Sequence, residues 1–261
     1  GYQALYDNTT GEKNTAVGTA ALTNNTTASN NSAFGREALK YNTTGASNVA
    51  VGREALVSNT TASLNTAVGY QSLYTITTSN ENTALGYQAG YNATNVEATY
   101  VGFKAGYGVT TAASGTAVGR LALGGNSAGV TGAENVAVGN AAMYVVTSGT
   151  DNVAVGALSL FDNTTGSYNT ALGSDALGNN TTASYNIAVG YQAGYSNTTG
   201  AQNTIIGETA GYSATTAIGN TFVGSDSGYL NTTGARNSFF GKNSGESITT
   251  GSKNTILGSY N

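Results

Sequence analysis

Asn14-Thr15-Ala16-Val17-Gly18 opens a unit that returns along the whole chain. The usual step from one copy to the next is 17 residues. A fixed period of this kind is the signature of a repeat protein, in which each unit packs against its neighbours. We number the recurring Asn as position 1 and the Gly as position 5 of each unit. Further copies of positions 1–5 stand at 31–35, 48–52, 65–69 and onward to 254–258.

The repeat predicts one repeat domain over residues 1–261. Its first residue falls at position 5 and its last at position 8, so we expect a processed chain or a piece of a longer one. A partial coil occupies 1–13, and later coils start at residues 14, 31, 48, 65, 82, 98, 115, 135, 152, 169, 186, 203, 220, 237 and 254.

Two corners divide each unit. Position 5 is Gly in every unit, position 8 is Ala or Ser, and position 15 is mostly Gly or Ala. Gly at a corner supplies either a positive φ angle or room for close backbone approach. Extended segments are expected between the corners, a short one at positions 1–4 and a longer one at positions 8–14. Gly and Asn-Thr-Thr return too often for a helix. The sequence therefore predicts an all-β fold, a parallel β-solenoid forming a two-sided β-roll of about 15 coils.

The short segment is apolar on both of its faces. Position 4 is always large and apolar, and position 3 is Ala or, in several units, bulky. All 22 charged residues lie outside positions 1–5. Since one face must fill the coil, we expect the other to meet identical chains, as a trimer or another cyclic oligomer. A single coil with ordinary alternation is the alternative. The residues of this interface or core strand are Ala16, Val17, Phe34, Val51, Val68, Leu85, Tyr100, Ile205, Phe222, Phe239 and Ile256.

Positions 3 and 9 vary together. Position 9 is Leu or Met in most units, and the bulky position-3 residues stand in or one coil after a unit with Gly at position 9. Volume lost on one side is thus restored on the other, so we expect the two positions to share a layer. Position 9 is Gly at Gly90, Gly106, Gly194, Gly211, Gly228 and Gly245.

This motif resembles the head repeats of trimeric autotransporter adhesins, which run Asn-Ser-Val-Ala-Ile-Gly-x-x-Ser. It is even more similar to the Asn-Thr-Ala-Val-Gly-Tyr-Gln-Ala-Leu repeats of bacterial surface proteins and phage tail-fibre-like proteins, best at 65–71 and 186–193. The resemblance implies a left-handed roll, trimerised through its short strand and displayed outside a cell or on a virion. The period here is longer, and the sequence shows no anchor or coiled-coil stalk pattern, so the family's mode of attachment is not carried over.

Composition argues against several functions. His and Cys are absent, so the usual bases and thiol nucleophiles are missing and we expect no enzyme. Acidic residues form no recurring pair and no calcium-binding nonapeptide, so neither metal nor cofactor is expected. Nine Lys and Arg residues, scattered singly, make no track for nucleic acid. No apolar run long enough for a membrane span occurs.

Two polar patterns remain as candidate sites. Tyr at position 10 would form a stripe able to contact sugars or protein, although ordinary packing is the alternative: Tyr6, Tyr74, Tyr91, Tyr107, Tyr144, Tyr195, Tyr212 and Tyr229. Asn at position 12 is formally an N-glycosylation acceptor, although Asn and Thr also favour turns: Asn8, Asn25, Asn42, Asn59, Asn163, Asn180, Asn197 and Asn231. At the same register Ile76, Val109, Val146 and Ile248 indicate that some of these side chains lean inward.

We therefore expect an extracellular fibrous segment of an adhesin or tail-fibre-like protein, a rigid shaft or head for multivalent surface attachment. Its partners would be identical chains and, beyond them, surface glycans or a host-surface protein. The alternative is a structural subunit of an extracellular filament that stacks end to end, with a glycan coat at the position-12 asparagines.

Overall fold

The computed structural model describes residues 1–94, 97–111, 114–124 and 129–259. Within these ranges the regular secondary structure is β only, as fifteen strands of three residues each. The chain forms two compact units, Gly1–Ala133 and Glu134–Asn261. Both units are built from the same coil, in which positions 2–4 form the strand. The predicted all-β parallel β-solenoid is thus confirmed, with about 14 turns of about 17 residues.

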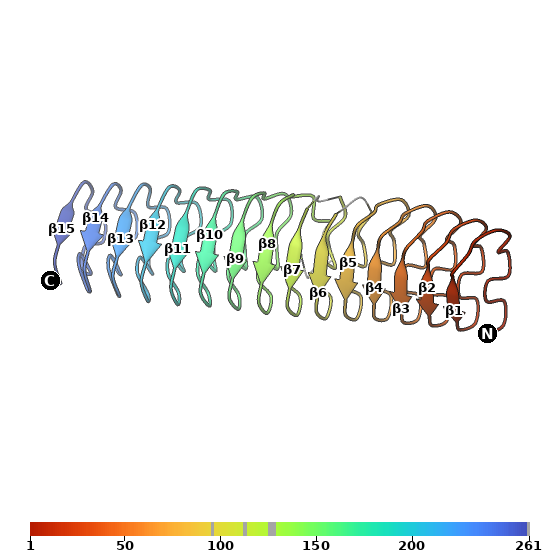
Figure 1. Cartoon of the computed structure of the whole chain (residues 1–261). Helices are drawn as coiled ribbons and strands as arrows, with labels where there is room; N and C mark the ends of the chain where they lie inside the picture. Colours follow the sequence, from red (N-terminus) through yellow and green to blue (C-terminus); the bar gives the residue numbers. More distant parts are fainter. Residues whose placement is uncertain (95–96, 112–113, 125–128, 260–261) are drawn as a thin grey trace. The chain divides into compact units, whose positions relative to one another are not determined.

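The first unit contains seven parallel strands. Within this unit, neighbouring strands pair in direct register, so that Thr15 lies opposite Ser32 and Ala16 opposite Ala33. Between Thr83 and Thr99 the step is one residue shorter, as the sequence requires. The strands are β1 (Thr15–Val17), β2 (Ser32–Phe34), β3 (Val49–Val51), β4 (Thr66–Val68), β5 (Thr83–Leu85), β6 (Thr99–Val101) and β7 (Thr116–Val118) (Figure 1).

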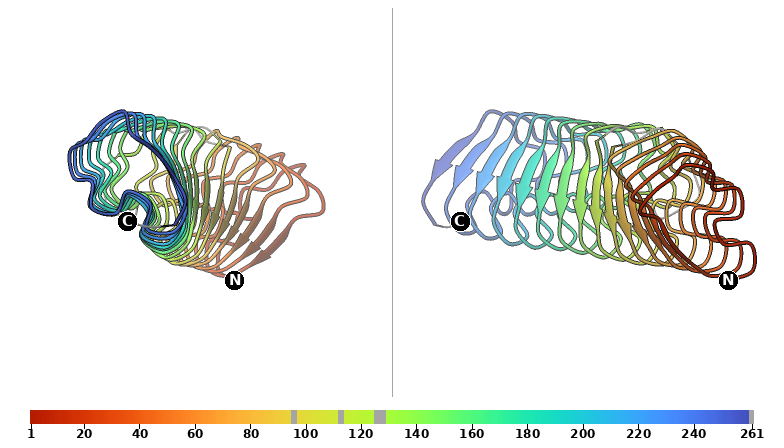
Figure 2. Two further views of the ribbon diagram at one scale, coloured as in Figure 1. Left: turned by 90° about the vertical axis from the view of Figure 1, so that its left-hand side faces the viewer. Right: turned by 45° about the vertical axis from the view of Figure 1, so that its right-hand side comes forward.

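The second unit repeats this arrangement with eight strands. Figure 2 shows that the strands lie side by side along one side of the coils, and that turns make up the opposite side. The strands are β8 (Val136–Val138), β9 (Val153–Val155), β10 (Thr170–Leu172), β11 (Ile187–Val189), β12 (Thr204–Ile206), β13 (Thr221–Val223), β14 (Ser238–Phe240) and β15 (Thr255–Leu257).

The second extended segment, predicted at positions 8–14, is not a strand. Successive strand residues point to opposite faces, yet Ala21 and Leu22 at positions 8 and 9 are both fully buried. Leu22 achieves this with a φ of 51°, in the left-handed region. The segment consists of turns, although it still bonds to the next coil through the N–H of Leu22 and the carbonyl of Ala38, 3.0 Å apart. Each described coil therefore has one β side in place of the two that we expected.

Glycine is required at position 5 on two counts. Gly18 has a φ of 139°, a conformation that L side chains rarely adopt. A Cβ on the same residue would also collide with the carbonyl of Gly35 in the next coil. Stacked coils approach here with backbone on backbone, so every unit needs Gly at this position.

The shared layer of positions 3 and 9 is confirmed. Phe222 is fully buried, and a Cβ on Gly228 would lie 2.9 Å from its ring. In the same way a Cβ on Gly245 would lie 2.5 Å from the ring of Phe239. Coils with Leu at position 9, such as that of Leu39, have Ala at position 3. The interior is therefore filled by a large side chain from either position, and beside Gly90 and Gly194, where position 3 is Ala, by Tyr100 and Ile205 of the next coil.

The complementary volumes of positions 3 and 9 predict that a second substitution restores stability lost through a first. We expect Phe222→Ala to destabilise the fold by about 3–5 kcal/mol, because removing the buried ring leaves a cavity inside the coil. Gly228→Leu alone should also destabilise it, since the new side chain meets the ring. The double variant recreates the Ala and Leu pair of other coils and should recover much of the loss, measured as the denaturation midpoint in guanidinium. A double variant that loses as much as the two single variants together would contradict the shared layer.

Candidate functional site

The outward side of the strands carries a row of apolar side chains at position 4, which we call the outer strand face. Position 3 points into the coil and position 4 points out, so the side chains of Val17, Leu85 and Phe34 are 55%, 47% and 42% exposed. The interior is already filled without them. No charged residue lies at positions 1–5, so the outer strand face is uncharged along both units.

The structure divides the predicted interface residues between the two sides of the strand. Tyr100, Ile205, Phe222 and Phe239 are buried inside the coil and contact no solvent. Ala16 and Ile256 also stand at position 3, in β1 and β15, where they are half-buried. The members of the set that point outward are Val17, Phe34, Val51, Val68 and Leu85.

Tyr100 is the one bulky interior residue with a polar atom. Its hydroxyl has no hydrogen-bond partner among the described residues. Burial raises the pKa of this hydroxyl far above its ordinary value, because the charged form would lack solvent. Tyr100 therefore acts as a filler of the layer, and its hydroxyl is not available to a ligand.

Asparagine at position 1 forms an internal ladder. In Asn48, Nδ2 donates to the carbonyl of Ala62 at 2.8 Å, and Oδ1 accepts the backbone N–H of Asn65 at 2.9 Å. The same pair of bonds recurs at Asn186, with Gly200 and Asn203. One side chain thus joins the start of a coil to its end and to the next coil.

Asparagine at position 12 forms a second internal ladder. Asn42 Nδ2 donates to Asn25 Oδ1 at 3.0 Å and to the carbonyl of Gly45 at 2.9 Å. The inward lean indicated by the apolar replacements is confirmed, since Ile76, Val109 and Val146 are fully buried at this register. Seven of the eight candidate acceptors are buried: Asn25, Asn42, Asn59, Asn163, Asn180, Asn197 and Asn231.

This burial argues against glycosylation of the folded coils. A glycan attaches to Nδ2, and in Asn180, for example, Nδ2 is enclosed and donates to both Asn163 Oδ1 and the carbonyl of Ala183. Only Asn8, in the first coil, is partly exposed, and its Nδ2 donates to the carbonyl of Gly11. The position-12 asparagines are therefore structural, which is the reading that turn chemistry favoured.

The tyrosines at position 10 stack into aromatic ladders on the outside of the coils. Tyr6 is largely exposed and the others are half-buried. In the first unit the ring centroids are 4.9 Å apart for Tyr74 and Tyr91 and 5.4 Å apart for Tyr91 and Tyr107. In the second unit the stacked pairs are Tyr144 with Phe161, Tyr195 with Tyr212, and Tyr212 with Tyr229, at 5.2, 5.3 and 5.2 Å.

Sequence reasoning missed part of this aromatic surface. Phe161 belongs to the position-10 ladder, although the predicted stripe contained only Tyr residues; its place at position 10 is the signal in the sequence. Two shorter ladders add to the surface. Tyr70, Tyr87 and Phe103 stack at position 6, each pair at 5.3 Å, and Tyr168 and Tyr185 stack at position 17, at 5.1 Å.

Cations accompany the ladders of the first unit. Lys104 Nζ lies 4.6 Å from the ring centroid of Tyr107, within cation–π range. Arg53 lies 5.6 Å from the ring centroid of Tyr70 and 2.8 Å from the carboxylate of Glu54. The hydrogen bond from Gln71, aided by Arg53, holds the pKa of Glu54 below its ordinary value despite burial. The charges of Arg53 and Glu54 are thus paired with each other.

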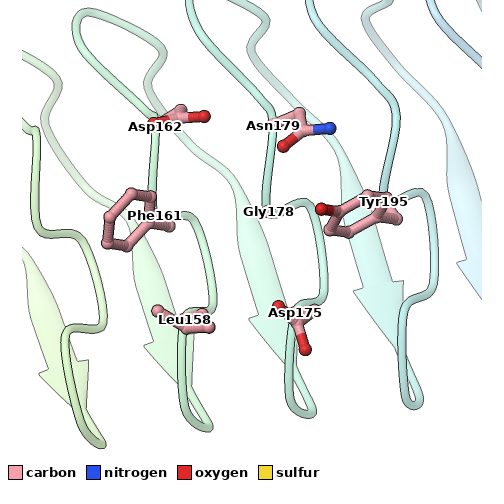
Figure 3. Close-up of a pocket in the computed structure, with 7 residues that line it drawn as sticks. All are labelled: Leu158, Phe161, Asp162, Asp175, Gly178, Asn179 and Tyr195. Atoms are coloured by element: carbon pink, nitrogen blue, oxygen red, sulfur yellow. The ribbon is translucent and has the colours of Figure 1, made fainter.

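A cavity interrupts the ladder of the second unit. Position 10 is Gly178 between Phe161 and Tyr195, and about 340 Å³ of space lies there. Figure 3 shows the two rings on either side of Gly178, with Asp162 at one end of the gap and Asp175 at the other. We call this cavity the ladder gap. It is the place where the repeated surface departs from its own pattern.

The described residues offer little reactive chemistry. No group of three or more His, Cys, Asp and Glu among them could hold a metal ion. In the same ranges, no helix has the length and apolar character that a membrane span requires. The chemical capacity of the surface therefore lies in aromatic faces, apolar side chains and isolated carboxylates.

The internal ladder predicts a pH-dependent variant. Asn186→Asp replaces the donor to Gly200 by an oxygen, so a buried carboxylate would face a carbonyl and its pKa would rise above the unfolded value of about 3.9. Below that value the protonated acid can donate to Gly200 and the penalty relative to wild type should be small. As pH rises through the raised folded pKa, the variant should lose on the order of 3–5 kcal/mol, measured by denaturation at each pH.

Asn186→Ala is the matched control, because it removes the same donor without adding a titratable group. Its penalty relative to wild type, about 1–3 kcal/mol, should not change with pH. An Asp penalty that is the same at about pH 3 and about pH 7 would contradict the buried donor at this site.

Comparison with known proteins assigns no family to the chain. No family model and no curated protein matches it. A functional assignment therefore has to come from the surfaces described above: the uncharged outer strand face, the aromatic ladders and the ladder gap.

Proposed function

We propose that this chain is a rigid segment of an extracellular fibrous protein of the adhesin or tail-fibre type, which attaches to a surface by many weak contacts. The observation that carries the proposal is the repetition of the same kinds of side chain on the outer surface of successive coils. Every coil presents an apolar residue on the outer strand face, and many coils add an aromatic ring to a ladder. The same chemistry is thus offered many times at a fixed spacing.

Identical chains are the partner that best fits the outer strand face. Rows of exposed aliphatic side chains such as Val51 and Leu172 favour association in water, and no charge along positions 1–5 opposes it. A closed ring of copies around these strands would cover the row in every chain at once. We propose a homotrimer of left-handed coils, on the strength of the motif's resemblance to adhesin head repeats.

The aromatic ladders are the proposed contact surface towards glycans or a host-surface protein. A stacked Tyr presents a flat edge and a hydroxyl, suited to weak contact with sugars or with protein. Repetition of a weak contact on a stiff support raises the overall affinity, because later contacts form at high effective concentration. Such a role requires neither catalysis nor a cofactor, and it places the segment outside the cell or on a virion.

The alternative is a structural subunit of an extracellular filament. It is favoured by the direct register of successive strands, since each coil offers the next the same three-residue edge. The buried position-12 asparagines speak against the glycan coat that we attached to this alternative. Binding of particular sugars on a glycan array would support the adhesin type, and indefinite fibres in electron microscopy would support the filament.

The oligomer proposal is tested by charging the outer strand face. We expect the wild-type chain to sediment as a trimer, and the variant Val51→Glu with Leu172→Glu to sediment as a monomer, because two charges per chain would be buried unpaired in the assembly. Analytical ultracentrifugation measures the mass, and circular dichroism checks that the coils remain folded.

Leu64→Glu is the control, since Leu64 is exposed at position 17 and is not part of the outer strand face at position 4. This variant should keep the wild-type mass. A wild-type chain that is folded and monomeric at all concentrations would overturn the proposed association.

A further inference from the structure

The ladder gap is a missing ring in an otherwise stacked row. Tyr144 stacks on Phe161 at an interplanar angle of 5°, and Tyr195 stacks on Tyr212 at 16°. Each of these rings thus has an aromatic partner on the side away from Gly178, and neither has one on the side towards it. The gap leaves two aromatic faces available in one cavity.

Glycine keeps the ladder gap open. A Cβ on Gly178 would lie 3.1 Å from the ring of Tyr195, a tight contact with a side chain that can move. The backbone of Gly178 itself is not in the left-handed region, so a larger residue is compatible with its conformation. A cavity of about 340 Å³ lies within the size range of small-molecule sites.

The charges around the gap are negative and unpaired. Asp162 and Asp175 line it, and neither forms an ion pair with any described residue. Asp175 accepts one hydrogen bond, from the hydroxyl of Ser174 at 3.0 Å. The residues that line the cavity include no Lys or Arg.

The first unit shows what the same ring surface accepts. There Lys104, at position 7, lies against the ring of Tyr107 at position 10. In the coil of the ladder gap, position 7 is Asp175 and position 10 is Gly178. In the first unit the chain itself places a cation, Lys104, against a ring of the ladder. At the ladder gap it places carboxylates beside rings that have no such cation among the described residues.

We propose that the ladder gap binds an organic cation, an ammonium or guanidinium group carried on an alkyl or planar body. The cation would lie between the faces of Phe161 and Tyr195, where the negative faces of the rings attract it. The carboxylates of Asp162 and Asp175 would balance its charge from the two ends of the gap. Two chemical sources fit equally, a free small amine and a Lys or Arg side chain of a partner protein.

The test is ligand-observed NMR at low salt with the intact chain. The probes are tetramethylammonium, choline, and the Nα-acetyl amides of lysine and arginine; acetate and methyl glucoside are the anionic and neutral probes. Binding of the cations without the anionic and neutral probes supports the proposal. Binding of the lysine and arginine amides alone indicates a partner side chain as the source. Binding of tetramethylammonium and choline as strong as that of the two amides indicates a free small ammonium compound.

Gly178→Tyr is the decisive variant, because it supplies the missing ring and should leave the coil folded. We expect it to abolish cation binding without lowering the denaturation midpoint. Asp162→Asn with Asp175→Asn should weaken binding about three- to thirtyfold and reduce its salt dependence. Thr23→Tyr is the matched control, since it adds a ring at position 10 of another coil, and it should bind cations as wild type does.

Three outcomes would overturn the proposal. Wild type could fail to bind any cation in preference to acetate. Gly178→Tyr could bind cations as well as wild type does, which would locate the binding elsewhere. Methyl glucoside could bind as strongly as choline and equally well to the Asp162→Asn and Asp175→Asn variant, which would make the ladder gap a neutral sugar site.

Discussion

The hydrogen bonds of the position-1 asparagines hold most coils closed and fix each of these coils on its neighbour; Ala98 and Gly115 replace the asparagine in two coils. Asn48 donates to the carbonyl 14 residues further along its own coil and accepts the N–H of Asn65 in the next. Both bonds are buried, so losing either would leave a polar group without water or partner. A short amide supplies donor and acceptor from one side chain at neutral pH, whereas an ionised Asp offers acceptors only. The register between coils follows, because the next backbone donor must reach the same oxygen, as it does even across the 16-residue step from Asn82 to Ala98.

The position-12 ladder shows what an interruption costs. Asn59 Oδ1 has no partner where Ile76 follows it in the next coil, and Asn197 Oδ1 has none where Ala214 follows. Within an unbroken run each amide oxygen accepts from the next amide nitrogen, as Asn25 does from Asn42. An orphaned acceptor therefore arises only at the end of a run. Long runs of identical residues are favoured on this physical ground.

Much of the fold could be predicted from the sequence, because its determinants repeat. The period, the strand at positions 2–4 and the exchange of volume between positions 3 and 9 were all visible in one chain. The turns at positions 9–12 were not, since Leu22 and Leu39, both at position 9, adopt left-handed φ angles that leucine rarely chooses. Stacking overrides that preference by burying Leu22 and bonding its backbone to the next coil. The direction of the position-12 asparagines could be inferred from the apolar residues at the same register, such as Ile76 and Val146, because Asn-Thr-Thr alone is compatible with a surface turn or a buried ladder.

The candidate sites were harder to predict because the ladder gap and the cation–ring contacts are departures from the repeat. The interior tolerates little variation, since each layer must fill one volume and satisfy the same polar groups. The outside is free to vary, and there the first unit has Lys104 against its rings while the second has carboxylates beside a gap. In the sequence Gly178 looks like any other glycine in a turn. In the structure it lies between the rings of Phe161 and Tyr195, and the space that a side chain would fill there is a cavity. A repeat of this kind thus combines a uniform interior with an outer surface on which single residues, such as Gly178, can differ from coil to coil while the coils beneath keep their register.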